Sequence, residues 1–270
     1  MIDMKYPILL VHGMGFRDRR HFCYWGRIPK TLEKEGIRVF FGGQDSNGSV
    51  EDNAAFLAAR IDEILKETGA EKLNVFAHSK GGMEMRYAIA KLGVGEKIAS
   101  LSTFQTPHNG SKTIDLVFRI FPKWILRAGS AVFDLWMRIC GDKKPKTYLC
   151  IESFSTAAAR RFNEENKTPD GIYCQSYGFV CKKWFSDIFM WWQNLIVGWI
   201  EGPNDGLLTP DAVKWANFRG VFKSNSNRGI SHCDEVDMRR RRLTKSSGEG
   251  ISDITDFYLS VARELADMGF

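Results

Sequence analysis

The sequence contains six cysteines but no C-x-x-C pair. Zinc ribbons and thioredoxin-type redox sites both use that spacing, so neither kind of site is predicted. We therefore expect free thiols in a reduced, cytosolic protein. The first residues also lack the apolar core of a secretory signal. A mature secreted form that begins at a new methionine stays open as an alternative.

Long apolar runs are also missing. The longest, at 188–200, is too short to span a bilayer and contains Gln193 and Asn194. The chain shows no internal repeat, no low-complexity segment and no nucleic-acid-binding motif. The sequence therefore disfavours a membrane-spanning protein, a repeat protein and a nucleic-acid-binding protein.

The composition is that of an ordinary globule. The 270 residues are 44% hydrophobic and carry 38 Lys plus Arg against 32 Asp plus Glu, a formal charge of +6. This length fits one large α/β domain or two small ones. The positive excess includes Arg239, Arg240, Arg241 and Arg242. We interpret this run as a solvated face, with contact to anionic lipid or nucleic acid as the less favoured role.

Strand-like and helix-like segments alternate through the first hundred residues. Short apolar runs predict buried parallel strands at 7–11, 37–41, 73–76 and 100–104. Apolar residues at helical spacing predict helices at 25–34, 53–68 and 81–92. This alternation predicts an α/β protein whose mostly parallel sheet carries helices on both faces.

The alternation stops after residue 110. Two amphipathic helices are predicted within 114–139, separated near Pro122, which cannot continue a helix. We interpret this insertion, at about 112–150 of a single domain, as a cap or lid over the sheet edge. Two ordinary outer helices are the alternative. Later elements are predicted as strands at 171–180 and 195–200 and a closing helix at 252–268.

The strongest chemical signal is the hexapeptide AHSKGG at 77–82, between a predicted strand and a predicted helix. It fits the G-x-S-x-G nucleophile elbow with Ala77 in place of the first glycine. In such an elbow Ser79 occupies a strained turn, and the strand and helix pass so close that the flanking residues must be small. The alternative is a serine that only caps the helix.

A serine nucleophile needs a histidine base, and the chain has five histidines. In this architecture the acid and then the base follow the serine, so His12 and His21 come too early. His78 adjoins the serine and should point the other way, and His108 precedes any late acidic loop. His232 is left as the predicted base. A solvated loop histidine is the alternative.

The orienting acid is predicted to be Asp205. It lies in a turn-rich Asn-Asp-Gly loop that follows the strand predicted at 195–200. Asp211, Asp187 and Asp170 are rivals, and a purely turn-forming loop is the alternative. The oxyanion of the tetrahedral intermediate needs two N–H donors. We predict the backbone N–H of Lys80, which follows the serine, and that of Met14, in the loop after the first strand.

Five segments together resemble the bacterial triacylglycerol lipases and related esterases of the α/β-hydrolase fold. They are PILLVHGMG at 7–15, LNVFAHSKGG at 73–82, STFQTPHNGS at 102–111, NDGLL at 204–208 and SHCDEVD at 231–237. The resemblance implies a triad of Ser79, Asp205 and His232. It also implies an oxyanion hole at Met14 and Lys80, and a mobile lid over 114–139.

The resemblance further implies a structural calcium near the histidine loop, with Asp187 and Asp234 as carboxylate ligands. A local salt bridge or hydrogen bonds of Asp234 are the alternative. Secreted members of the pseudomonad group carry a disulfide near the NDG loop, whereas 207–213 here contains no cysteine. That difference argues against secretion and against long-chain triglyceride as the natural substrate.

The sequence thus predicts a serine carboxylic-ester hydrolase that needs no cofactor for catalysis. Its expected partners are an ester or lipid substrate and a lipid–water interface, with no nucleic acid. An acyl thioesterase or a lysophospholipase on the same scaffold is the first alternative, since fold alone does not set the substrate. A catalytically silent binding protein is the second.

Overall fold

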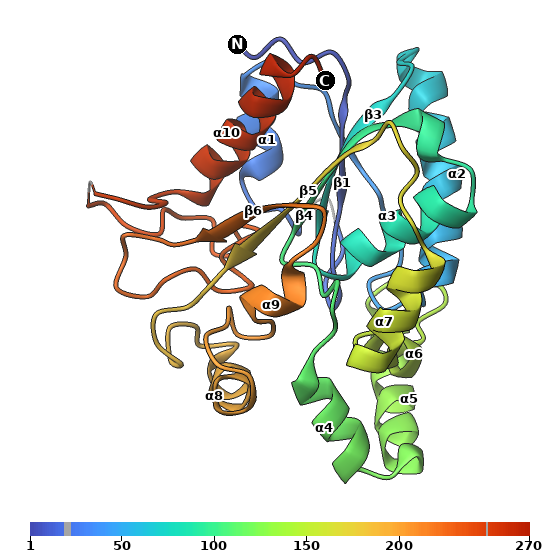
Figure 1. Ribbon diagram of the computed structural model, residues 1–270, viewed down its shortest axis with the longest axis vertical. Coiled ribbons are helices and arrows are strands. Elements are labelled where there is room, and N and C mark those ends of the chain that lie inside the picture. The colour runs from blue at the N-terminus through green and yellow to red at the C-terminus, as the bar shows by residue number, and fades with distance from the viewer. Residues whose placement is uncertain (19–22, 247) are drawn as a thin grey trace.

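A computed structural model describes residues 1–18, 23–246 and 248–270 (Figure 1). The strands are β1 Ile8–Val11, β2 Val39–Phe41, β3 Leu73–His78, β4 Ile98–Phe104, β5 Tyr173–Phe179 and β6 Asn217–Phe222. They form one sheet in the order β2-β1-β3-β4-β5-β6, and each neighbouring pair is parallel. The α/β class expected from the sequence is confirmed.

The helices fill the intervals between the strands. They are α1 Ile28–Lys34, α2 Val50–Thr68, α3 Lys80–Lys91, α4 Lys112–Ile120, α5 Lys123–Ile139, α6 Thr147–Glu152, α7 Thr156–Glu165, α8 Trp191–Ile200, α9 Pro210–Val213 and α10 Ile254–Asp267. A short 3-10 turn, Gly95–Lys97, precedes β4. The helices predicted in the first hundred residues are all present, with ends shifted by a few residues.

The two faces of the sheet are covered by different helices because successive side chains of a strand point to opposite sides. Ile8 and Leu10 of β1 pack with residues of α1 and α10, whereas Leu9 and Val11 pack with residues of α2 and α3. Figure 1 shows α1 and α10 on one side of the sheet and α2 and α3 on the other. Because all six strands are parallel, their carboxyl ends meet at one edge of the sheet, which is where ligands bind in open α/β sheets.

The segment between β4 and β5 forms four helices at that edge. The predicted break is confirmed: α4 ends at Ile120, Pro122 has a φ of −55°, and α5 starts at Lys123. Carboxylates hold the base of the segment, since Asp115 accepts hydrogen bonds from the backbone N–H and the hydroxyl of Thr156 at 2.9 and 2.5 Å. In Figure 1, α4, α5 and α8 extend together from the carboxyl end of the sheet.

Two sequence predictions differ from the structure. The strand predicted at 195–200 is wrong, because these residues lie in α8. A short apolar run fits a strand or a buried helix equally well, and here the buried Asn194 and Val197 lie three residues apart, which is helical spacing. The edge strand β6 was not predicted. Its side chains alternate between exposed and half-buried, so it lacks a continuous apolar run.

Two further features concern membrane spans and cysteines. No helix within the described segments combines the length and the apolar character needed to cross a bilayer. The six cysteines are free thiols.

Candidate active site

Ser79 occupies the tight turn between β3 and α3. Its φ of 53° and ψ of −126° are values that residues with a Cβ rarely adopt. The turn is held from both sides: the Ser79 N–H donates to the Phe104 carbonyl at 2.9 Å, and the Thr106 hydroxyl donates to the Ser79 carbonyl at 2.8 Å. The Ser79 side chain makes no capping hydrogen bond to α3. The turn thus has the strained geometry of a nucleophile elbow.

The glycines after Ser79 let strand and helix approach each other. A Cβ at Gly81 would lie 2.6 Å from the Val11 carbonyl oxygen and 2.7 Å from that of His12. A Cβ at Gly82 would collide with the Thr106 side chain. Real Cβ atoms do not come this close to backbone oxygens. The structure therefore requires small residues here, as the sequence predicted.

His232 and Asp205 form a close buried pair. The Nδ1 atom of His232 lies 2.5 Å from Oδ2 of Asp205. The other carboxylate oxygen of Asp205 accepts hydrogen bonds from the N–H groups of Leu207 and Leu208 at 2.8 and 2.7 Å. The His232 N–H also donates to the Asp205 carbonyl at 2.9 Å. Backbone and side chain together fix the imidazole in one orientation.

Electrostatics keep the Asp205 carboxylate charged. Burial by itself raises the pKa of Asp205, but the charge and hydrogen bond of His232, with the two backbone N–H groups, outweigh burial and lower that pKa below its ordinary value. The rival acids do not share this setting, and the buried Asp187 pairs with Arg239 at 2.8 Å. Asp211 is exposed and pairs with Lys214 at 2.7 Å, and Asp170 is exposed.

Tertiary contacts, not the preceding element, bring Asp205 to the site. Its loop follows helix α8, so the expectation that it directly follows a strand is wrong. The Cys181 N–H, just after β5, donates to the Asn204 carbonyl at 2.8 Å. The chain therefore leaves the end of β5, forms α8 and returns to the same place. The end of β5 still positions the acid, although some twenty residues separate the two along the chain.

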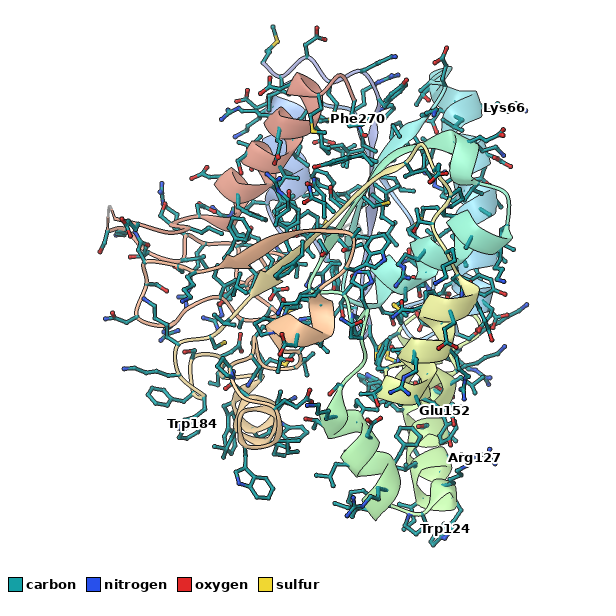
Figure 2. All side chains as sticks on the ribbon, viewed as in Figure 1. Lys66, Trp124, Arg127, Glu152, Trp184 and Phe270 are labelled. Atoms are coloured by element: carbon teal, nitrogen blue, oxygen red, sulfur yellow. The ribbon has the colours of Figure 1, made fainter. Side chains whose placement is uncertain are left out.

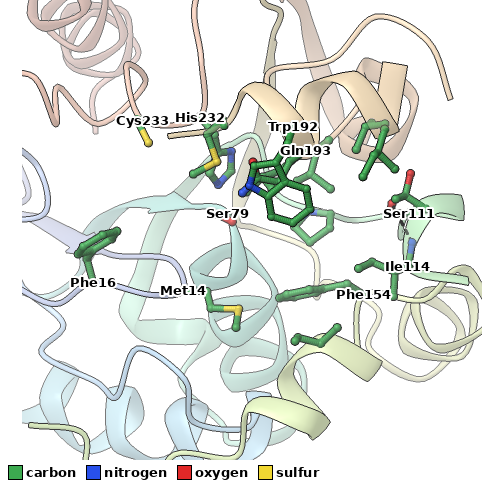
Figure 3. A pocket seen from close by; sticks show the side chains of 18 of the residues that line it. Met14, Phe16, Ser79, Ser111, Ile114, Phe154, Trp192, Gln193, His232 and Cys233 are labelled. Atoms are coloured by element: carbon green, nitrogen blue, oxygen red, sulfur yellow. Dashed lines mark hydrogen bonds between the residues drawn. The ribbon is translucent and has the colours of Figure 1, made fainter. Parts of the chain in front are cut away.

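Ser79 and His232 line the same pocket (Figure 3). In the described part of the chain, the Ser79 hydroxyl makes no hydrogen bond to the His232 ring. Such contacts are often long before a substrate binds, and they shorten in the reacting complex. The geometry therefore places the three predicted triad residues in one site, with the Asp205–His232 contact already formed.

A second polar layer lies beneath the triad and was missed by sequence reasoning. The His78 ring is fully buried, with Nδ1 2.7 Å from the Tyr24 hydroxyl and Nε2 2.8 Å from a Glu235 carboxyl oxygen. Its ring centroid lies 4.5 Å from that of His232. His78 thus turns away from the pocket, as expected, but packs directly behind the base. The signal available in the sequence was Glu235, an acid three residues after His232.

This layer is kept neutral by burial. Burial, the charge of Asp205 and a hydrogen bond to it hold the pKa of Glu235 well above its ordinary value. Burial and the nearby His232 hold the pKa of His78 well below its ordinary value. One ligand atom each of His78, His232 and Glu235 lies within 4.8 Å of the others, a spacing that a metal ion could use. Among these three described residues, a direct hydrogen bond joins only His78 and Glu235, whereas Nδ1 of His232 is bonded to Asp205.

The loop after β1 passes beside the nucleophile. A Cβ at Gly13 would lie 2.8 Å from the Ser79 Cβ, and Met14 lines the pocket next to Ser79. The backbone N–H groups of Met14 and Lys80 donate to no other group in the described part of the chain. Lys80 opens α3, where the first N–H groups have no partner inside the helix. Both predicted oxyanion donors are therefore available beside Ser79.

Buried polar contacts tie this loop to the elbow helix. The Lys80 ammonium forms an ion pair with Glu84 one turn along α3, and both side chains are fully buried. Gln44 donates to Glu84 at 3.2 Å and to the His12 carbonyl at 3.0 Å. Because the Lys80 side chain is used in this way, only its backbone is left to face the pocket.

The other described histidines have structural partners. The His12 ring nitrogens face the carbonyls of Gly13 and Gln44 at 2.8 and 3.1 Å, and burial lowers the pKa of His12 to about 4. His108 is buried between Thr103 and Arg86. His21 lies outside the described residues. These contacts agree with the exclusion of His12 and His108 as the catalytic base, which was predicted from their positions along the chain.

The pocket above Ser79 has a volume of about 340 Å³. Its walls are mostly apolar and come from the oxyanion loop, α4, α8 and the Asp205 and His232 loops. They include Met14, Ile114, Val117, Phe154, Met190, Trp192, Ile196 and Leu208. Figure 3 shows Phe154, Ile114 and Trp192 around the opening over Ser79. The site can therefore hold an apolar chain with its reacting end at the serine.

The two predicted calcium ligands lie together behind His232. The Ser231 hydroxyl is 2.5 Å from Oδ2 of Asp187 and 3.0 Å from Oδ2 of Asp234. The Arg239 guanidinium contacts both carboxylates, at 2.8 and 3.4 Å. Asp187 and Asp234 are thus brought together as predicted. The salt bridge of Asp234 corresponds to the alternative considered from the sequence.

Known proteins share both the sequence pattern and the fold. No family model matches the chain. The Saccharomyces cerevisiae protein named Triacylglycerol lipase 2 is 28% identical over 263 residues, which cover 92% of this chain and 74% of the yeast protein. The Vibrio cholerae triacylglycerol lipase is 34% identical over 119 residues, which cover 44% of this chain and only 38% of that lipase.

Solved structures agree at the level of the fold. The mature form of Bacillus licheniformis lipase BlEst2 matches with a TM-score of 0.66 and 21% identity, covering 88% of this chain and 89% of that one. A metagenomic carboxyl esterase matches with a TM-score of 0.75 and 15% identity, covering 98% and 77%. The α/β-hydrolase fold and the resemblance to triacylglycerol lipases and esterases are confirmed.

Proposed function

We propose that this chain is a serine carboxylic-ester hydrolase that forms an acyl-enzyme on Ser79. The observation that carries the proposal is the elbow serine at the floor of an apolar pocket, facing a histidine whose far nitrogen is bound to a buried carboxylate. The lipase and esterase names of its relatives support the same class of reaction.

The Asp205–His232 contact sets the direction of proton transfer. The Nδ1–H group of His232 donates a hydrogen bond to the carboxylate, which fixes this tautomer and leaves the lone pair of Nε2 for the Ser79 hydroxyl. As the Ser79 oxygen bonds to the ester carbonyl carbon, His232 takes the hydroxyl proton. When the bond to the alcohol breaks, His232 gives that proton to the leaving oxygen. A water molecule then repeats the cycle on the acyl-enzyme and releases the acid.

The negative oxygen of the intermediate needs fixed donors. In our proposal these are the N–H groups of Met14 and Lys80, which flank Ser79 and have no other acceptor in the described residues. Such preorganised donors stabilise developing charge without reorganising during the reaction, and one donor accounts for about 100- to 1000-fold in rate. No cofactor enters any of these steps.

The pocket favours an acyl chain as the bound group. Its walls are apolar, and the polar groups at its floor match a carbonyl and an alkoxide. The yeast and bacterial relatives are named for triacylglycerol, so a lipid ester is the substrate class that we propose. A thioester or a lysophospholipid presents the same acyl carbonyl, and either remains the alternative on this scaffold.

We also propose that 112–150 is the lid and that it meets a lipid–water interface. Ile114 and Val117 of α4 line the pocket, whereas α5 leaves Trp124, Val132 and Ile139 more than 70% exposed. On α8, Trp199 is 85% exposed. Contiguous apolar patches exposed on a protein surface mark contact with a lipid or a partner. Figure 2 shows Trp124 and Arg127 of α5 at the same end of the molecule as Trp184.

The hydrolase is tested by labelling with a fluorophosphonate probe. Wild-type protein should be labelled, and Ser79→Ala should abolish labelling and ester hydrolysis. Ser111→Ala is the matched control, because Ser111 lines the same pocket but its hydroxyl is bonded to Glu201 at 2.7 Å. Wild-type protein that stays unlabelled would support the silent binding protein instead. A panel of p-nitrophenyl esters, triglycerides, lysophospholipids and acyl thioesters then separates the enzyme alternatives.

The interface is tested with substrate below and above its solubility limit. If α5 contacts lipid, the double variant Trp124→Ser/Val132→Ser should lose activity on emulsified ester and keep activity on soluble ester. Phe56→Ser on α2 is the control, since Phe56 is 43% exposed and lies on a helix that does not line the pocket. Equal losses on both forms of substrate would contradict the proposed surface.

A further inference from the structure

Two buried acids and one arginine form a compact cluster behind the histidine loop. Asp187 is 1% and Asp234 is 6% exposed, and both reach the hydroxyl of Ser231. The Arg239 side chain is 17% exposed, so its charge is largely withdrawn from solvent. Three elements are joined here: the segment before α8, the loop with His232 and the chain that leaves this loop.

The arginine contacts both acids at once. Nη2 of Arg239 lies 2.8 Å from Oδ2 of Asp187, and Nε lies 3.4 Å from Oδ1 of Asp234. Nη2 also donates to the Ser186 carbonyl at 3.4 Å. The planar guanidinium presents several donors in a fixed array, which suits two carboxylates approached from one side.

These contacts do not fit a calcium ion in the same place. Calcium takes six to eight oxygen ligands at about 2.3–2.6 Å, and it would have to lie between the two carboxylates. The guanidinium contacts those carboxylates itself, and one of its nitrogens is within hydrogen-bond distance of Oδ2 of Asp187. A second cation there would face Arg239 directly. The two carboxylates are therefore suited to the guanidinium of Arg239, which supplies the positive charge from within the chain.

The cluster reaches the catalytic base through a short turn. The Asp234 N–H donates to the Ser231 carbonyl at 2.8 Å and to its hydroxyl at 3.2 Å, and the Ser231 N–H donates to Asp234 at 3.3 Å. His232 is enclosed in this turn. Whatever holds Asp234 in place also holds the backbone from which the imidazole extends toward Ser79.

We propose that Arg239 replaces a structural calcium and positions the histidine loop by clamping Asp234 to Asp187. Arg239 does not line the pocket over Ser79, so it is a positioning residue. The catalytic part of this inference rests on the proposed function, whereas the replacement of calcium does not. A change far from the reacting atoms that misplaces a catalytic group by about 1 Å can cost about 100-fold in rate.

The first test uses the full wild-type chain and needs no activity. Its melting temperature should be the same in EDTA, in buffer and in added Ca²⁺. A fall in EDTA that added Ca²⁺ reverses would overturn the proposal. Because this measurement does not depend on ester hydrolysis, it separates a failure of the clamp from a failure of the proposed function.

The second test removes the guanidinium. Arg239→Ala should lower kcat by up to about 100-fold with little change in KM, since the base and not the acyl pocket is displaced. Arg239→Lys should restore part of kcat, and guanidinium ion at low, non-denaturing concentration should partly rescue Arg239→Ala. Arg241→Ala is the matched control: Arg241 is exposed, lines a surface hollow together with Arg239 and Trp184, and pairs with no carboxylate in the described part of the chain.

The remaining outcomes also decide the question. An Arg239→Ala protein with the kcat and melting temperature of Arg241→Ala would contradict the clamp. If Arg239→Ala does not fold, Asp187→Asn removes one of the two charges that Arg239 contacts and leaves the arginine in place. That variant should also lower kcat at constant KM, and unchanged kcat would contradict the proposal.

Discussion

The Nε2 atom of His78 lies 2.8 Å from a carboxyl oxygen of Glu235, and neither side chain is reached by solvent. This contact links the strand that carries the nucleophile to the loop that carries the base. Glu235 is also 3.8 Å from Nδ1 of His232, so the neutral layer lies directly against His232 and the Asp205 carboxylate.

The first prediction concerns the pH dependence of stability. Burial, then the charge of Asp205, holds the pKa of Glu235 well above its ordinary value of 4.5, so the folded protein binds this proton more tightly than the unfolded chain does. Its stabilising contribution is complete below pH 4.5 and declines as the pH rises toward the higher folded value. Glu235→Gln removes this titration, so the variant should gain stability relative to wild type as the pH rises above 4.5.

Urea unfolding at several pH values measures this difference. Glu33→Gln on the exposed side of α1 serves as the control, because it removes a carboxyl group that solvent reaches. A difference between Glu235→Gln and wild type that stays constant with pH would show that the Glu235 carboxyl group is not held protonated.

The second prediction concerns the orienting acid. Asp205→Asn keeps the shape of the side chain but can present an amide N–H to Nδ1 of His232, which favours the wrong tautomer. We expect kcat to fall by about 10³- to 10⁴-fold with little change in KM or fold. Steady-state kinetics on a soluble ester and a thermal melt check both parts. Asp211→Asn, at the exposed rival acid, should leave kcat unchanged, and the reverse ranking would reassign the acid.

The third prediction concerns packing at the elbow. Gly81→Ala places a methyl group 2.6 Å from the Val11 carbonyl oxygen, so β1 or α3 must shift. We expect a large fall in melting temperature together with loss of activity. Gly129→Ala in α5 is the control, since nothing lies within 4 Å of its added Cβ. It should stabilise the protein by up to about 1 kcal/mol, because alanine costs less conformational entropy in a helix than glycine.

The fourth prediction concerns acyl selectivity. Ile114→Trp fills part of the apolar pocket over Ser79, so kcat/KM for long-chain p-nitrophenyl esters should fall much more than for acetate or butyrate esters. Ile120→Trp changes the same helix at a position that is 60% exposed, and its chain-length profile should match wild type. Matching profiles for both variants would mean that the acyl chain binds elsewhere.

Local sequence was enough to predict the first five strands of the sheet and the elbow. The strand periods, the small residues after Ser79 and the turn between strand and helix are all properties of short contiguous segments. His232 could be assigned because only five histidines exist and the order of the triad along the chain excludes the others. The loop with Asp205 was found from its turn residues, although the element before it was predicted wrongly.

The sequence by itself determined the α/β alternation, the position of Ser79 and the chain order of its acid and base, because these depend on spacing within short segments. Only the tertiary structure decided that α8 is a helix, that His78 and Glu235 support the base from behind, and that Arg239 contacts Asp187 and Asp234. These features depend on residues up to 157 positions apart being buried together. Burial decides which polar groups must find partners, and no local pattern records which partners they find.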